Sequence, residues 1–250
     1  MKHGGVERHN DHGMLLYFPP ALLNSGRYTN GVNINGETRN TTGWTMLLPF
    51  IDKAPEFDRW DFNEASSTSN PRAGGGLGGV GNDTTNAALW KTVPKAMICP
   101  SHPEGGEKST WRPANNHFYS RRNATKTSYL FSTGVFTDYN HNYTRYITDI
   151  RQGAFGNNGA ARFAQITDGT SNSFCIGEAW GGADYRYSSH YGPWGLNGVH
   201  TSVHGRVYSN NSRTLDNNRF NANQRRQWML NGPWNINDTR KRVYAWVFSS

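Results

Sequence analysis

The chain has 250 residues, of which 35% are hydrophobic and 13% aromatic, and its formal net charge is +8. This length suffices for one large domain with a real core, and the aromatic share exceeds that of a disordered chain. No run approaches the ~18 apolar residues of a membrane-spanning helix, so no membrane span is expected. The basic residues are scattered along the chain, so nucleic acid is not the expected partner.

The first hundred residues alternate between apolar runs and loops rich in Asn, Gly and Ser. Two prolines interrupt the apolar run 14–23, so no continuous helix is expected there. The densest apolar patch, at 44–62, predicts a short helix from Pro49 to Phe57. The composition of 66–88 predicts a loop insertion.

Apolar and β-branched composition predicts short strands in the rest of the chain. These strands are expected at 96–99, 127–136, 160–166, 173–178 and 243–248. A second loop insertion, rich in Asn, is predicted over 190–227. The pattern indicates one domain with a small core and many long, aromatic-studded loops.

The segment Asp-Gly-Thr-Ser-Asn at 168–172 predicts a turn, because Gly takes the positive φ that tight turns need. If this turn joins two strands, Asp168 and Glu178 would lie at the same end of a sheet. Two carboxylates about 5 to 10 Å apart can cleave a glycosidic bond, or they can bind Ca²⁺ together with backbone carbonyls. The interpretation we favour is structural, with Asp168 capping its own turn and Glu178 paired with an arginine.

Other combinations of reactive side chains are weaker. His200 and His204 have metal-ligand spacing only on a helix, and the glycines around them argue against one. No Gly-x-Ser-x-Gly nucleophile motif is present. Cys99 and Cys175 fit either one disulfide in an oxidising compartment or two buried free thiols. No cofactor is expected, and Ca²⁺ is the one metal ion that the carboxylates suggest.

Several tryptophans stand beside Asn, Gly and Arg. Their rings could stack on the apolar faces of sugars while amides bind the hydroxyls, which predicts a ligand-binding surface. Alternatively they anchor long loops onto a small core, which we favour. The candidate ligand-binding residues are Trp111, Trp180, Trp194 and Trp234.

Five landmarks occur in order along the chain. They are Phe-Pro-Pro at 18–20 behind a His-Asn-Asp-His stretch at 9–12, Gly-Trp-Thr-Met-Leu-Leu-Pro-Phe-Ile at 43–51, Met-Ile-Cys-Pro-Ser at 97–101, Ser-Tyr at 128–129 with Gly134, and Gly-Ala-Phe-Gly at 153–156 ahead of Ile-Thr-Asp-Gly-Thr-Ser-Asn at 166–172 and Gly-Glu at 177–178. In this order they resemble the domain of unknown function 1559 family, whose members are bacterial pilin-like surface proteins with a prepilin-type N-terminus.

The resemblance implies an α+β, pilin-like fold in a single domain, 1–250, with an antiparallel sheet, short helices and long loop insertions. Residues 1–23 would be the remnant of an N-terminal helix and its Pro-Pro turn. The apolar helix that precedes this part in the family, and the His-x9-Asp-Gly block that often closes it, are not found, so we expect both ends to be truncated. The resemblance also implies export to the cell surface or the extracellular space.

Two functions follow from these observations. The first is an extracellular pilin-like structural or surface protein that acts by assembly or adhesion, with itself or other surface proteins as partners. The alternative is a carbohydrate-active protein, either a glycan-binding module or a glycoside hydrolase, with polysaccharide as its partner. The missing catalytic motif favours a protein without enzymatic activity. Were it an enzyme, Asp168 and Glu178 would make it a glycoside hydrolase.

Overall fold

The computed structural model describes the chain in segments separated by gaps. The described residues are 17–24, 39–67, 84–102, 105–108, 123–134, 136, 142–149, 151–179, 192–196, 203–206 and 246–247. Residues 1–16 and most of the predicted loop insertions at 66–88 and 190–227 lie outside them.

The central element is a four-stranded sheet in the order β6-β3-β7-β8. β3 (Tyr129–Ser132) pairs antiparallel with β6 (Ile176–Glu178) and parallel with β7 (His204–Arg206). β7 pairs parallel with β8 (Trp246–Val247). The predicted antiparallel sheet is therefore found at one of these three pairings, and the other two are parallel.

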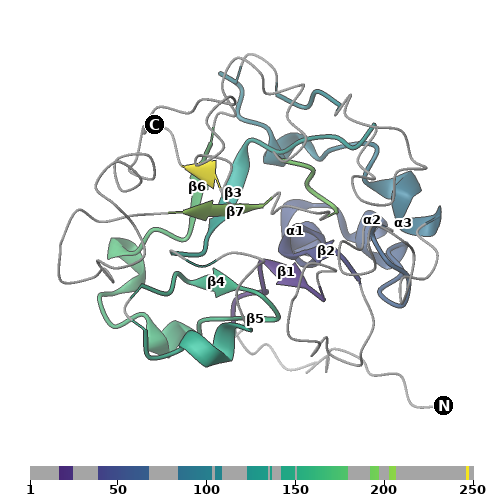
Figure 1. Cartoon of the computed structure of the whole chain (residues 1–250). Helices are drawn as coiled ribbons and strands as arrows, with labels where there is room; N and C mark the ends of the chain where they lie inside the picture. Colours follow the sequence, from purple (N-terminus) through teal and green to yellow (C-terminus); the bar gives the residue numbers. More distant parts are fainter. Residues whose placement is uncertain are drawn as a thin grey trace, which may run out of the picture.

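Two smaller sheets, each of two strands, are antiparallel. β1 (Leu22–Leu23) pairs with β2 (Thr41–Thr42), and β4 (Phe155–Gly156) pairs with β5 (Gly159–Ala160). Figure 1 shows α1, α2 and α3 gathered on one side of the central sheet, with β4 and β5 below it. The combination confirms the predicted α+β class.

The helices of the described residues are short, and the longest has six residues. They are α1 (Gly43–Leu47), η2 (Leu48–Ile51), α2 (Ala54–Asp58), α3 (Thr84–Leu89), η4 (Lys95–Met97), η5 (Tyr143–Tyr146), η6 (Phe163–Gln165) and η7 (Thr170–Asn172), where η marks a 3-10 helix. None of them is both long enough and apolar enough to cross a membrane.

The single helix predicted from Pro49 to Phe57 is instead two helices, η2 and α2. Asp52 takes a left-handed conformation (φ 58°, ψ 35°), and its N–H donates to the carbonyl of Leu48. A left-handed residue at this place ends a helix, because the chain then leaves the helical path. Pro55 lies in the first turn of α2, where the missing N–H has no helical partner to lose.

The predicted strands are shorter in the structure or replaced by turns. The first half of the segment 96–99 lies in η4, because Pro94 precedes that helix and the N–H of Ile98 donates back to Lys95 at 3.1 Å. The segment 160–166 begins in β5 and continues as η6. The predicted strand 127–136 contains β3, and Gly134 (φ +66°) ends its extended course. The segments 173–178 and 243–248 contain β6 and β8.

The core lies beside β3. Phe131 is completely buried, with its ring 4.6 Å from that of Trp44 and 4.8 Å from that of Phe155, measured between centroids. A second aromatic pair, Trp60 and Trp194, packs at 5.6 Å on the side of the helices. Burial of these rings is the main stabilising contribution that this small core can make.

Candidate functional site

The Phe-Pro-Pro and Gly-Trp landmarks pack against each other. The backbone N–H of Gly43 donates to the carbonyl of Ala21 at 2.9 Å. A Cβ atom at position 43 would collide with the carbonyl oxygen of Pro20 and stand 3.2 Å from Cζ of Phe131. Gly43 thus lets α1 lie directly on the chain after Pro20, and Trp44 then reaches β3.

The two glycines Gly134 and Gly153 form a close backbone crossing at the end of β3. A Cβ atom on Gly134 would collide with the carbonyl oxygen of Arg151 and lie 2.6 Å from the nitrogen of Gly153. A Cβ atom on Gly153 would lie 2.5 Å from the nitrogen of Gly134. Glycine is therefore needed at both positions, because the two backbone segments are too close for a Cβ atom.

Segments of three landmarks meet at the other end of β3. The N–H of Ser128 donates to the carbonyl of Met97, and the N–H of Ala179 donates to the carbonyl of Ser128, both at 2.9 Å. Tyr129 lies opposite Glu178 in the strand register. The Cys-Pro-Ser, Ser-Tyr and Gly-Glu segments are thus held together by backbone hydrogen bonds.

The side chains at this junction form a small polar cluster. The Tyr129 hydroxyl hydrogen-bonds to Cys99, and the Cys99 sulfur lies 3.1 Å from the Ser101 hydroxyl. Burial raises the pKa of Tyr129, and the nearby Cys99 and Glu178 raise it further, because a negative charge on either disfavours the phenolate. Tyr129 therefore stays a neutral hydroxyl at physiological pH and can join these groups by hydrogen bonds.

The structure places Asp168 in a turn and Glu178 at the end of a strand. Asp168 is exposed in the turn before η7, whereas Glu178 is the last residue of β6, at the strand end remote from that turn. The turn does not join two strands, because η6 precedes it, and so the basis for expecting adjacent carboxylates is lost.

The contacts that the structure describes for Asp168 and Glu178 differ from the turn cap and the arginine pair expected from the sequence. The turn is closed by Asn172, whose side-chain amide donates to the carbonyl of Asp168 at 3.0 Å, and by Gly169 at φ +87°. Within the described part of the chain, Glu178 makes no ion pair with arginine, and Tyr129 is its neighbour. No group of three or more His, Cys, Asp and Glu side chains that could hold a metal ion is found among the described residues.

The cysteines are free thiols, so the disulfide between Cys99 and Cys175 is not formed. Cys175 precedes β6 and its carbonyl accepts the N–H of Ser132 at 2.8 Å. Since strand residues alternate between faces, Cys175 and Ser132 face away from Tyr129, which Cys99 contacts. The two thiols therefore approach β3 from opposite faces. Burial raises the pKa of the Cys175 thiol.

Of the four candidate ligand-binding tryptophans, the structure describes Trp194, and it is buried rather than exposed, with 2% of its surface accessible. Its indole N–H donates to the carbonyl of Thr92 at 2.6 Å and lies 3.2 Å from the Thr125 hydroxyl. Trp194 anchors its loop on the core, which is the interpretation favoured from the sequence. Trp111, Trp180, Trp234 and His200 lie outside the described residues, and the described part of His204 is its backbone in β7.

A cavity of about 440 Å³ lies between η2–α2 and the segment that joins α3 to η4. Half of its lining residues are aliphatic, Trp194 adds an indole ring, and four of the others are charged. The lining residues are Leu48, Ile51, Asp52, Lys53, Glu56, Leu89, Thr92, Val93, Pro94, Lys95, Ala96 and Trp194. The volume lies within the range of small-molecule sites, about 300–1,000 Å³.

Comparison with known families shows which protein family the chain belongs to. A family model described as a protein of unknown function (DUF1559) matches residues 8–243. The chain belongs to the DUF1559 family. No curated protein and no solved structure matches it. Membership confirms the resemblance carried by the five landmarks, and the contacts above show what their residues do.

The cavity is the part of the DUF1559 chain that sequence reasoning missed. Its two walls are more than 30 residues apart in sequence, and Trp194 is about 100 residues further on. One signal was present in the sequence: Leu, Ile, Val and Ala positions at 48–56 and 89–96 that are interleaved with Lys and Glu. That signal is common to many amphipathic segments, so it predicts a cavity only once the two segments are known to be neighbours.

Proposed function

We propose that this DUF1559 chain is a pilin-like, extracellular structural protein that acts by assembly or adhesion at a cell surface. The observation that carries the proposal is the use of the landmark residues. Gly43, Trp44, Gly134, Gly153 and Tyr129 all pack around β3 or hold neighbouring segments against it. Such residues specify a frame for loops, as a structural protein requires, and none of these contacts assembles a reacting centre.

Exposed apolar side chains at the border of the sheet support contact with other molecules. β6 is the outermost of the described strands on its side of the sheet, and 36% of Ile176 and 47% of Phe174 are accessible. A border strand with apolar side chains can pair with another chain. On this proposal, assembly between copies uses β6.

The experiment measures association and location together. Sedimentation velocity of the purified chain over a hundredfold concentration range should show concentration-dependent oligomers, and a membrane-impermeant label on intact cells should modify the protein. Ile176→Lys should reduce association by tenfold or more, because a charged side chain on a border strand opposes edge pairing.

The matched control is Phe50→Lys. Phe50 is 65% exposed in η2, on the side of the helices, and should tolerate the same charge without loss of association. A chain that stays monomeric throughout and is never labelled on cells would refute the proposal.

A further inference from the structure

We infer that the cavity beside α2 binds a small molecule with an apolar body and one carboxylate, such as an aromatic or branched aliphatic acid. The inference concerns binding of a free ligand and goes beyond assembly at the cell surface. It depends on three features of the cavity: fixed walls, an apolar interior and an unequal distribution of charge.

The walls of the cavity are held in place by hydrogen bonds that the lining residues make within the protein. On one side, the N–H groups of Asp52 and Lys53 both donate to the carbonyl of Leu48, which fixes the turn between η2 and α2. On the other side, the N–H of Met97 donates to the carbonyl of Pro94 at 2.9 Å. Trp194 is bonded through its indole N–H to Thr92. A ligand would therefore enter a largely pre-formed site, as small-molecule sites usually are.

The interior favours an apolar body of moderate size. Leucine, isoleucine, valine, proline and alanine side chains and one indole ring make up most of the lining. A dry cavity of about 150 Å³ is enough for a benzene ring, so about 440 Å³ holds a ring with a short chain. Burial of such a body removes apolar surface from water on both partners.

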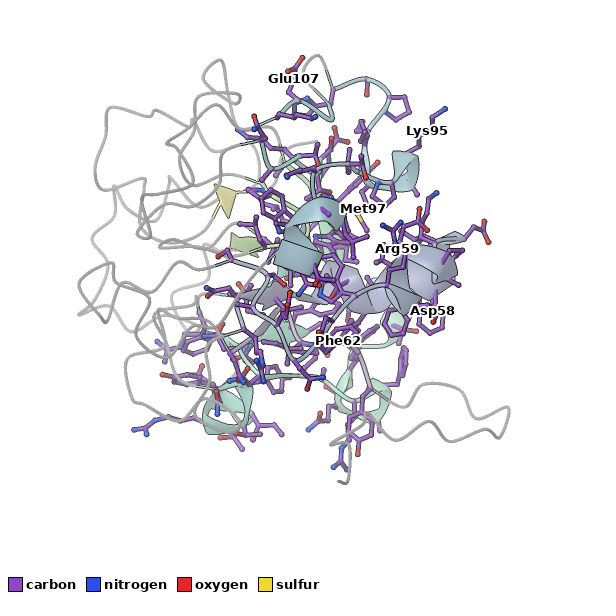
Figure 2. The ribbon with its side chains drawn as sticks, turned by 90° about the vertical axis from the view of Figure 1, so that its right-hand side faces the viewer. Asp58, Arg59, Phe62, Lys95, Met97 and Glu107 are labelled. Atoms are coloured by element: carbon purple, nitrogen blue, oxygen red, sulfur yellow. The ribbon has the colours of Figure 1, made fainter. Side chains whose placement is uncertain are left out.

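The charges differ between the two walls. On the α2 wall, Lys53 is paired with Glu56 at 3.2 Å, and Asp52 adds a second carboxylate. On the η4 wall, Lys95 forms no ion pair with any described residue. Figure 2 shows Lys95 projecting outward from η4 on the side away from α2, and the residue is exposed, so its ammonium group lies at the rim of the cavity. A carboxylate would therefore be placed at the η4 wall, beside Lys95 and away from the acidic side.

The test uses 3-phenylpropanoate as the probe, with saturation-transfer NMR titration of the full chain. We expect saturable binding with a dissociation constant of about 1 mM, which is typical for a ligand of this size. The uncharged 3-phenylpropanamide should bind about 2- to 5-fold more weakly, since an exposed ion pair contributes little. Lys95→Gln should weaken the acid by the same factor and leave the amide unchanged, which isolates the contact between the two charges.

A variant that fills the cavity tests most directly whether the acid binds there. Ala96→Phe puts a ring into the site from an exposed position and should weaken the acid at least tenfold. Ala88→Phe, also at an exposed position but outside the lining, is the control for size, and Lys91→Gln is the control for charge. Both controls should bind the acid as the unmodified chain does, and thermal unfolding should be unchanged in all four variants.

A free acid and the C-terminal residue of a peptide share this chemistry, so acetyl-Ala-Ala-Phe is titrated beside the probe. Tighter binding of the peptide assigns the site to a peptide end, and tighter binding of 3-phenylpropanoate assigns it to a free acid. Absence of saturable binding by both probes, or equal binding by Ala96→Phe and the unmodified chain, would overturn the inference.

Discussion

Replacement of Gly43 by alanine tests whether the landmark glycines are required for packing. The added Cβ atom would collide with the carbonyl oxygen of Pro20 and approach Cζ of Phe131 to 3.2 Å. The Pro20 carbonyl belongs to the backbone and cannot rotate away, and Phe131 is completely buried between other rings. Overpacking of this kind costs about 1–3 kcal/mol. In a chain of 250 residues that corresponds to a fall in Tm of about 2–12 °C.

The assay is thermal and urea unfolding of both proteins, followed by circular dichroism. Gly169→Ala is the comparison, because the nearest atom to its added Cβ is Asn172 Nδ2 at 3.7 Å and its cost comes from φ +87° alone. That backbone strain is about 1–3 kcal/mol, because φ +87° with ψ 141° is a conformation that residues other than glycine rarely adopt. A Tm for Gly43→Ala within 1 °C of the unmodified chain would show that α1 can shift, and the packing argument would then be wrong.

Two other substitutions test the core and the ion pair between Arg151 and Asp149. Phe131→Ala should lower the free energy of unfolding by about 3–5 kcal/mol, because it leaves a cavity between Trp44 and Phe155, and a loss below 1 kcal/mol in urea unfolding would contradict this placement. The Arg151 side chain donates to Asp149 at 2.8 and 2.6 Å, and the pKa of Asp149 is lowered, chiefly by this hydrogen bonding. A lowered native pKa stabilises the fold above the unfolded value near 3.8 and loses this effect as the pH falls through the native value. Asp149→Asn should therefore lower the free energy of unfolding by at most about 1 kcal/mol at pH 7. The difference in Tm between the two proteins should narrow below pH 3.8. A difference in Tm that stays constant from pH 7 to pH 2.5 would contradict this prediction.

The sequence predicted the α+β class and the family because both depend on local patterns. Gly43, Gly134 and Gly153 each stand where a backbone must approach another backbone, so glycine is needed whatever surrounds them. Turn and strand positions near 129 and 176 were also recognisable from short apolar runs. Their ends were less predictable, since a strand ends where its partner ends.

The errors arose where tertiary contacts override local pattern. The apolar residues at 96–99 suggested a strand, yet Pro94 and the buried Met97 favour one turn of 3-10 helix against the core. For Trp194 the sequence left two interpretations, and the favoured one, an anchor for its loop, holds because its N–H has partners at Thr92 and Thr125 that are about 70 to 100 residues away. No local signal shows that such distant partners are available.

Lys126 shows the same limit for a charged residue. Lys126 is completely buried beside the start of β3, although charged side chains usually lie on the surface. Its backbone N–H donates to the carbonyl of Glu107 at 3.2 Å. Gly192 lies against its side-chain stem: a Cβ atom added to Gly192 would be 3.3 Å from Cβ of Lys126. A lysine at such a position is held by packing of its aliphatic stem as well as by charge, and composition alone cannot distinguish it from an exposed one.

The placement of the landmarks explains why family membership alone does not give a function here. The family's recognisable residues meet along β3, where glycine, tryptophan and tyrosine fix how segments cross. The cavity is lined largely by other residues, and Lys95 and Ala96, which the binding experiment alters, belong to none of the five landmarks. A chain could therefore keep the frame while changing what the cavity accepts. It follows that Ala96→Phe and Gly43→Ala should separate the two properties, the first reducing binding with the fold intact and the second reducing stability first.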